Sequence, residues 1–223
     1  MNKPVFRRLL AYLLDLLIVI IISSAIASLP VFKKQYNEYE KLTNDYLDVL
    51  AEASNDPAKA TELLNNDAIL EMSYKISKKG LFINVINVVI TALYFIGFQY
   101  YTGGKTGGKA LFKIEVVPTD GKKLKFRHIL IRSLVVNNIV ITTVSLLILA
   151  LCTQKVYMNV SQYVELVQMG ILFLSAGMIL YTADGYGLHD KLAHTRVILS
   201  EEKEYYMTKK VKDAKVIKEK VEK

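Results

Sequence analysis

The chain has 223 residues, and its 52% hydrophobic content, positive mean hydropathy and long apolar runs indicate a membrane protein rather than one or two ordinary soluble domains. The net charge of +8 lies mostly beside apolar runs rather than in a soluble basic stripe with interleaved aromatic residues, so we expect no nucleic-acid binding. Cys152 is the single cysteine, which excludes an intrachain disulfide and a multi-cysteine metal site. Composition therefore predicts a membrane protein.

The first apolar run covers residues 9–29 and contains one acid, Asp15. A run of that length spans a bilayer as a helix, and a carboxylate within it costs about 2.5–3.5 kcal/mol. Arg7 and Arg8 precede the run, and Ala25 to Ala27 resembles a signal-peptide cleavage site. Because the run is longer than a usual signal-peptide core and is interrupted by Asp15, we favour a retained membrane helix over a cleaved signal peptide.

Three further runs are long enough to span a bilayer, at residues 81–101, 134–152 and 164–183. Residues 102–133 hold eight Lys or Arg against two acids, whereas residues 30–80 hold seven Lys against nine acids. The positive-inside rule then places both termini and residues 102–133 in the cytoplasm, and residues 30–80 and 153–163 outside. The expected fold class is an all-α membrane protein with four transmembrane helices.

The segments between the spans also carry patterns. In the extracytoplasmic insert, residues 30–80, apolar side chains recur at three- and four-residue steps, and Asp56-Pro57 predicts the start of a second helix from about residue 58 to 76. We therefore expect a helical hairpin there. Residues 102–133 predict a small cytoplasmic surface element, with a strand at residues 114–117 and a return at residues 124–126. Residues 200–223 alternate Lys and Glu and predict a solvated helix or a disordered arm.

Two segments resemble catalytic or metal motifs. Residues 103–109 match most of a nucleotide P-loop, but Ala110 replaces the hydroxyl residue that would hold magnesium, and the segment follows a membrane span rather than a buried strand. His189, Asp190 and His194 form the other cluster, but a five-residue spacing does not put both imidazoles on one helical face. We find no hydrolase signature and predict no enzyme activity, no cofactor and no metal site.

Polar residues near the inner ends of the spans predict one cluster around Asp15. Asp15 lies about 9 Å along the helix from Leu9, and Arg8 lies two helical turns before it on the same face. The cluster would include Asp15, Arg8, Arg132, Asn137 and Gln99. It either fixes helix packing, at about 1 kcal/mol per contact, or forms a site for a proton or a monovalent cation.

Taken together, the motifs resemble the RDD family of bacterial membrane proteins, which is named for an arginine and two aspartates. Residues 8–15 read Arg-x-x-Ala-x-x-x-Asp, residues 104–117 resemble Gly-x-Thr-x-Gly-Lys…Val-Val, and residues 188–198 resemble His-Asp-x-x-Ala-x-Thr-x-Val. On this match the arginine is Arg8, the first aspartate is Asp15, and the second is Asp190 or Asp120. The matching motif positions are Arg8, Asp15, Gly104, Thr106, Gly108, Lys109, Asp120, His189, Asp190 and Thr195.

The resemblance implies a multi-pass protein of the bacterial cytoplasmic membrane, with residues 1–199 as the membrane domain. It also implies transport of an unassigned ligand, or cation/proton exchange as suggested for some members. The chain departs from the family pattern in its long insert and in His194, where a glycine is common. Two functions stay open: transport or exchange at Asp15, tuned by Arg8 or Arg132, and a non-transporting scaffold or regulator of a membrane-protein partner. Small residues in the fourth span suit close helix packing or homo-oligomers: Gly170, Ser175, Ala176 and Gly177.

Overall fold

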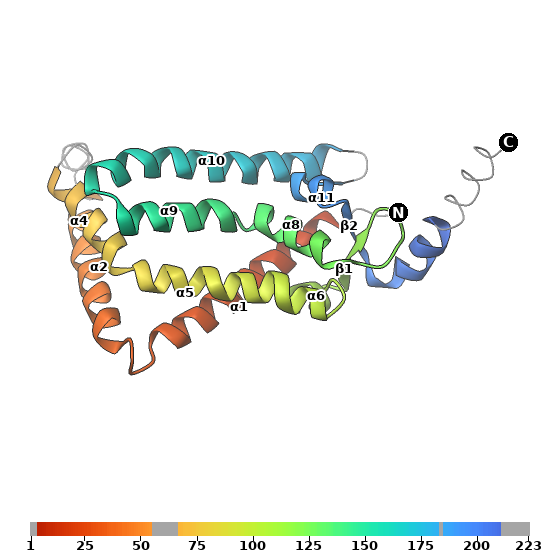
Figure 1. The fold of residues 1–223 in the computed structure, drawn as a ribbon, viewed down its shortest axis with the longest axis horizontal. Helices are drawn as coiled ribbons and strands as arrows, with labels where there is room; N and C mark the ends of the chain where they lie inside the picture. The colour runs from red at the N-terminus through yellow and green to blue at the C-terminus, as the bar shows by residue number, and fades with distance from the viewer. Residues whose placement is uncertain (1–3, 55–66, 183–184, 211–223) are drawn as a thin grey trace. The chain divides into compact units, whose positions relative to one another are not determined.

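The structure, a computed structural model of the 223-residue chain, describes residues 4–54, 67–182 and 185–210 (Figure 1). The described part is predominantly helical. Its helices are α1 (Val5–Ala27), α2 (Lys33–Ser54), α4 (Asp67–Lys79), α5 (Leu81–Ala92), the π-helix η1 (Leu93–Phe98), α6 (Gln99–Tyr101), α7 (Gly107–Leu111), α8 (Phe126–Val136), α9 (Ile139–Leu151), α10 (Gln154–Tyr181), α11 (Leu188–Leu192) and the 3₁₀-helix η2 (Ser200–Glu202). Two strands, β1 (Ile114–Pro118) and β2 (Thr195–Leu199), complete the elements.

Three helices are long and apolar enough to cross a membrane, and they cover Val5–Ala27, Leu81–Tyr101 and Gln154–Tyr181. A fourth crossing is made only if α8 and α9 together form one broken span. The chain is therefore a membrane-embedded protein with three or four spans. The run at residues 9–29 is helical as far as Ala27 and the run at residues 81–101 is helical throughout, and the second of them includes the π-helical turn η1.

The third span differs from the continuous helix predicted at residues 134–152. α8 ends at Val136, α9 begins at Ile139, and the two axes differ by 56°. Asn138 has a φ of 50°, in the left-handed region, and an α-helix cannot continue through that conformation. Asparagine tolerates this region better than most residues do, which explains why an apolar run without Pro or Gly still breaks.

The fourth predicted span, residues 164–183, lies for the most part within a longer helix. Helix α10 begins at Gln154, ten residues before the predicted start, so residues 153–163 are not the expected short link. The hydropathy pattern misses this start because polar residues interrupt the first three turns of α10. Tyr157, in these turns, lies 5.8 Å from the ring of Tyr74, centroid to centroid. The first turns of α10 therefore pack against α4.

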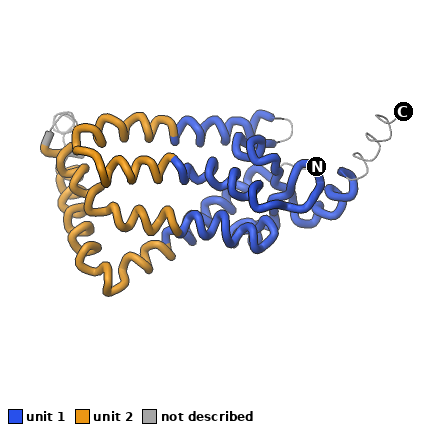
Figure 2. Tube along the Cα trace, in the orientation of Figure 1, with its two compact units in different colours: residues 1–20, 90–140, 168–223 blue, residues 21–89, 141–167 orange. Residues whose placement is uncertain are grey.

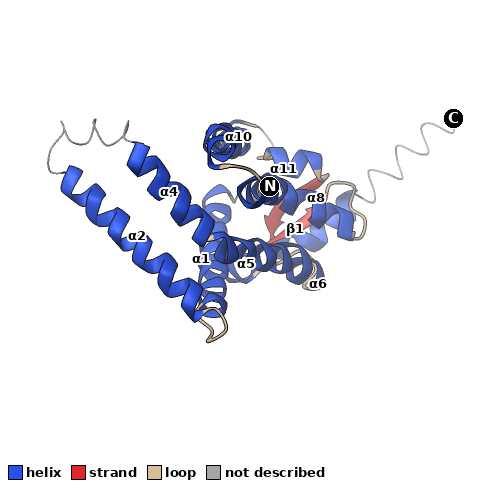
Figure 3. Cartoon of the chain, turned by 60° about the vertical axis from the view of Figure 1, so that its left-hand side comes forward, coloured by secondary structure: helices blue, strands red, loops and turns tan. Residues whose placement is uncertain are grey.

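The chain divides into two compact units (Figure 2). Unit 2 comprises residues 21–89 and 141–167, and in it α2 and α4 lie side by side (Figure 3). Lys79 pairs with Glu38 at 2.6 Å across these helices, and Lys78 donates 2.7 Å to the carbonyl of Leu149 near the carboxyl end of α9. A lysine there satisfies carbonyls that have no partner within the helix. Residues 58–66, the predicted start of the second insert helix, lie outside the described residues.

Unit 1 comprises the described parts of residues 1–20, 90–140 and 168–223 and holds the two-stranded sheet. Strand β1 confirms the predicted strand at residues 114–117, but its partner is β2 and not residues 124–126. The strands are antiparallel, with Val116 opposite Val197. Residues 124–126 cannot return as a strand because Phe126 starts α8. A pairing across about eighty residues leaves no local signal, so the all-α class needs this correction.

The sheet packs against apolar side chains from α1 and α8. One cluster joins Ala11 and Ile129 to both strands, and a second joins Val117 and Ile198 to Tyr206, which is 3% exposed. Residues 203–210 are helical, and Lys203 binds the buried Glu115 at 2.9 Å. The described start of the tail is therefore a helix that packs on the sheet, and the rest of the segment predicted as a solvated helix or a disordered arm lies outside the described residues.

Candidate functional site

Asp15 is fully buried in α1 and accepts hydrogen bonds from three donors. The hydroxyl of Tyr94 donates at 2.8 Å, the backbone N–H of Gly108 donates at 2.7 Å, and the hydroxyl of Thr106 donates to the other carboxylate oxygen. The ammonium of Lys109 lies 3.8 Å from the same oxygen as Thr106. The carboxylate in the apolar run is therefore satisfied by the segment that resembles a P-loop.

That segment can reach Asp15 because of its local sequence. Thr106 caps the short helix α7, where its side chain accepts from the backbone N–H of Lys109 while its hydroxyl donates to Asp15. Gly108 lies so close to α1 that a β-carbon would stand 2.2 Å from the carbonyl oxygen of Ala11. Glycine at this position thus allows α7 to pack directly on α1.

Asp190, in α11, forms a second buried carboxylate site, between two arginines. Arg8 and Arg132 each bind one of its oxygens, and the backbone N–H of Gly187 donates to it at 3.0 Å. Burial alone would raise the pKa of Asp190, but the positive charges of Arg132 and Arg8 outweigh it and hold that pKa well below its usual range. Asp190 is therefore a carboxylate at neutral pH.

The groups around Asp190 are held in turn by their own partners. Arg8 also donates 2.6 Å to the carbonyl of Gly185, and Arg132 donates 3.3 Å to the hydroxyl of Thr195 at the start of β2. His189 shares a hydrogen bond of 2.7 Å with Ser175 in α10. Burial and the nearby Arg132 lower the pKa of His189 to about 3, so its imidazole is neutral at pH 7.

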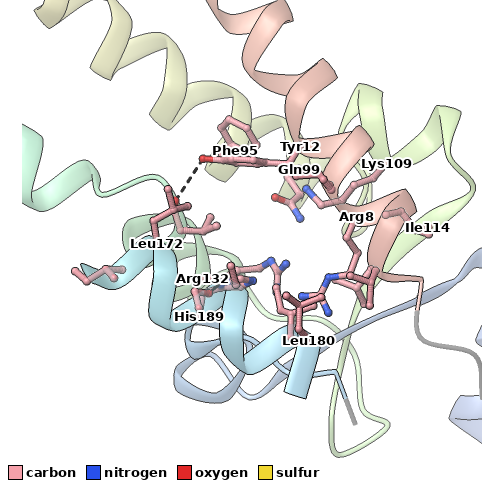
Figure 4. Close-up of a pocket in the computed structure, with 18 residues that line it drawn as sticks. Arg8, Tyr12, Phe95, Gln99, Lys109, Ile114, Arg132, Leu172, Leu180 and His189 are labelled. Carbon is pink, nitrogen blue, oxygen red and sulfur yellow. Dashed lines mark hydrogen bonds between the residues drawn. The ribbon is translucent and has the colours of Figure 1, made fainter. Parts of the chain in front are cut away.

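A cavity of about 250 Å³ lies beside both carboxylate sites, within unit 1. Figure 4 shows that Arg8, Lys109 and Arg132 point toward it from three different elements, together with Gln99 and the neutral His189. Most of the remaining lining side chains are apolar and come from α1 and α10. Neither Asp15 nor Asp190 lines it, and no other carboxylate of the described residues does. The cavity therefore combines three cationic side chains with a lining that is otherwise mostly apolar.

Lys109 is the cavity's titratable cation. Its side chain is 11% exposed, donates 3.2 Å to Thr106 and lies 5.6 Å from the centre of the Phe95 ring. Burial lowers the pKa of Lys109 to about 7, and the charges of Arg132 and Arg8 act in the same direction against the opposing effect of Asp15. Lys109 can therefore gain or lose a proton near neutral pH.

The structure corrects the predicted partner of Asp15. Arg8 and Arg132 bind Asp190, whereas Asp15 is held by Lys109 and three neutral donors. Arg8 shares a helical face with Asp15, but seven residues separate them by about 10 Å along the axis, too far for direct contact. The expected single cluster is in fact two neighbouring carboxylate sites with different partners.

Other predicted residues have supporting positions. Gln99 is buried and donates to the carbonyl of Gly104 at 3.4 Å, and Asn137 accepts from the hydroxyl of Tyr12 at 3.4 Å. Gly104 has a φ of 104°, and a β-carbon there would stand 2.4 Å from the carbonyl oxygen of Val116. Asp120 lies outside both sites, half exposed, where it accepts from the backbone N–H of Lys122. The geometry thus favours Asp190 as the second family aspartate.

The residues of the site that escaped the sequence analysis include Tyr94, Ser133 and Gly187. Tyr94 lies in η1, where the hydroxyl of Ser133 donates 2.7 Å to the carbonyl of Phe95. A π-helical turn re-aims side chains by one position and has no simple sequence signal. Ser175 was predicted only as a small packing residue, and its bond to His189 could not be foreseen without the fold.

A family model described as the RDD family matches residues 3–194. The chain belongs to the RDD family. Comparisons with curated proteins and with solved structures returned no match. The match covers both carboxylate sites of this RDD protein and every residue of the motif set except Thr195. It ends at His194, which has a φ of 51° in the left-handed region. Glycine adopts that conformation without strain, so the backbone at His194 is of the kind that suits glycine.

Proposed function

We propose that this RDD protein is a four-span protein of the bacterial cytoplasmic membrane that recognises an anionic ligand in the cationic cavity of unit 1. The charge distribution supports an orientation with residues 102–133 in the cytoplasm and residues 30–80 outside, because residues 102–133 carry eight bases against two acids and residues 30–80 are net acidic. In this orientation both termini, α7, α11 and the cavity lie at the cytoplasmic side. The bent pair of α8 and α9 then counts as one span.

One observation carries the choice of an anion: Arg8, Lys109 and Arg132 converge on a cavity that no carboxylate of the described residues lines. Both arginines already bind Asp190, yet each guanidinium has five N–H donors, and the bonds to Asp190, Gly185 and Thr195 engage only part of them. A monovalent cation entering the cavity would face these charges before it reached Asp15, which is fully buried. An anion meets complementary charge instead.

A second candidate, cation/proton exchange, is favoured by the pairing of Asp15 with Lys109 at 3.8 Å. A buried acid and base in contact can exchange a proton against a bound ion when the pair opens to solvent. The third candidate, a non-transporting scaffold or regulator, uses a surface for a membrane-protein partner and needs no ligand flux. The three candidates predict different results: anion binding depends on Lys109, exchange moves protons and cations and depends on Asp15, and a scaffold moves no ion.

Binding of dimethyl phosphate to the purified full chain in a neutral detergent tests the proposal, because this probe keeps one negative charge around neutral pH. Calorimetry should show saturable binding by the wild type and no saturable binding of sodium or potassium. Lys109→Gln should weaken binding by about tenfold or more, since a hydrogen bond to a charged group contributes about 1.5–3 kcal/mol. Lys105→Gln is the matched control, because Lys105 is partly exposed, pairs with Glu115 and does not line the cavity.

Proteoliposomes separate the other candidates. Proton movement driven by sodium or potassium that is lost in Asp15→Asn and kept in Asp120→Asn would establish exchange and overturn the anion proposal. Asp120 provides the control because its half-exposed carboxylate lies outside both sites. If no probe binds and no ion moves, while crosslinking captures a partner that is lost when residues 31–79 are deleted, the scaffold is correct.

A further inference from the structure

The apolar side of the cavity has a feature that an anion alone does not explain. This side includes Leu9 of α1 and four residues of α10: Leu172, Ala176, Ile179 and Leu180. Leu9, Leu172 and Leu180 are 53%, 50% and 61% exposed, and they lie in helices long and apolar enough to cross a membrane. The edge of the cavity is thus continuous with helix surfaces that face hydrocarbon. A small hydrated anion would leave this wall without a partner.

We infer that the ligand is an anionic phospholipid of the inner leaflet, whose phosphodiester binds Arg8, Lys109 and Arg132 while an acyl chain lies along α10. This inference rests on the proposed function, and it names the ligand class. A cluster of basic side chains between membrane helices at the cytoplasmic side is the charge pattern that lipid headgroups bind. The lining matches the lipid, because three cationic side chains and the apolar side chains of α10 line the same cavity.

The size of the cavity fits part of a lipid. A volume of about 250 Å³ equals the liquid volume of roughly eight waters. It accommodates the phosphate and the first methylene groups, and the remaining chain stays in the bilayer against the exposed leucines. Each methylene group removed from water contributes about 0.8 kcal/mol, but a chain that stays in hydrocarbon gains little of this. The headgroup charge therefore determines the preference among lipids.

Binding should also depend on pH. Asp15, Arg8, Arg132 and Asp190 are the charged groups around Lys109, and the nearby His189 is neutral at pH 7. With Lys109 protonated, these groups sum to one positive charge, and with Lys109 neutral they sum to zero. An anionic headgroup binds the protonated form better, so its affinity falls as the pH rises through about 7.

Native mass spectrometry of the full chain, exchanged into a neutral detergent, tests the inference with lipids of identical acyl chains. One molecule of dioleoylphosphatidylglycerol should bind per chain. At about pH 6 it should bind about tenfold more tightly than dioleoylphosphatidylcholine, and at about pH 8 this preference should be smaller. Ala176→Phe, which fills the apolar side, should remove this preference. Leu174→Phe is the matched control, because Leu174 is exposed on the same helix and does not line the cavity.

The outcomes are distinguishable. If dimethyl phosphate binds with the expected dependence on Lys109 but phosphatidylglycerol shows no preference, the lipid inference is wrong and the anion proposal stands. If neither binds, both are wrong. If Ala176→Phe prefers phosphatidylglycerol as strongly as Leu174→Phe does, the lipid binds elsewhere on the protein and the inference is overturned. The same conclusion follows if Lys109→Gln keeps the preference of the wild type.

Discussion

Replacing Gly108 with alanine tests the packing of α7 on α1 more sharply than any charge substitution. The added methyl carbon would stand 2.2 Å from the carbonyl oxygen of Ala11 and 2.9 Å from a carboxylate oxygen of Asp15. The carbonyl belongs to the backbone of a 23-residue helix, so it cannot rotate away as a side chain would. Helix α7 must instead move outward, which breaks the bond from the Gly108 N–H to Asp15.

The magnitude follows from these two effects. Overpacking in a close-packed interior costs about 1–3 kcal/mol, and the loss of a hydrogen bond to a charged group costs about 1.5–3 kcal/mol. Alanine has a better helix propensity than glycine, which returns up to about 1 kcal/mol. The net expectation is a loss of about 2–5 kcal/mol in the free energy of unfolding.

Reversible denaturation of the purified chain in detergent, followed by far-ultraviolet circular dichroism, measures this change. Gly170→Ala is the matched control, because Gly170 lies inside α10 and a β-carbon there has no neighbour within 4 Å among the described residues. The control should be neutral or slightly stabilised. If Gly108→Ala unfolds within about 0.5 kcal/mol of both the wild type and the control, the close approach of α7 to α1 is refuted.

Substitutions at three other positions follow from the same geometry. Asp190→Asn leaves two buried arginines without their carboxylate and should cost about 3–5 kcal/mol at neutral pH, measured by the same denaturation. Because the pKa of Asp190 is lowered, its contribution is fully present above the usual carboxyl range and is lost as the pH falls below it, so the loss should shrink in acid; an unchanged loss would contradict the ion pair. Asp15→Asn keeps the size of the side chain but turns one acceptor oxygen into an amide donor that faces Tyr94, Thr106 or Gly108. We expect a loss of about 1–3 kcal/mol in the free energy of unfolding in the same assay. A gain in stability would refute the assignment of these three donors to Asp15. His194→Gly should be tolerated within about 1 kcal/mol, and His194→Val should cost about 1–2 kcal/mol, because β-branched valine disfavours the left-handed conformation more strongly than histidine or glycine does. Equal stabilities of the two variants would contradict the left-handed conformation of residue 194.

The sequence predicted the site's residues better than their partners. A carboxylate in an apolar run requires hydrogen-bond donors, so Asp15 could be identified from hydropathy alone. Its partners could not, because helical periodicity reports which residues share a face and not which segment packs there. That periodicity predicted a pairing of Arg8 with Asp15. In the structure Arg8 pairs instead with Asp190 of α11, about 180 residues later in the chain.

The fold shows the same division. The apolar runs predicted membrane helices, since a length and a hydropathy suffice for that. The break at Asn138 and the π-helical turn around Tyr94 are backbone conformations that apolar patterns do not encode. Strand β1 was visible from its alternation and valines, but its pairing with β2 depends on a contact across the whole second half of the chain.

Proton uptake on anion binding is the measurement that tests the central claim most directly. Calorimetry of dimethyl phosphate binding at about pH 7.5, repeated in two buffers with different ionisation enthalpies, gives the number of protons taken up. Because the pKa of Lys109 is about 7, much of it is neutral at that pH, and an anion beside it should draw in a fraction of one proton. Uptake by the wild type and by Lys105→Gln, with none by Lys109→Gln, is the predicted result. Binding without proton uptake, or uptake that persists in Lys109→Gln, would contradict the assignment of Lys109 to the anion site.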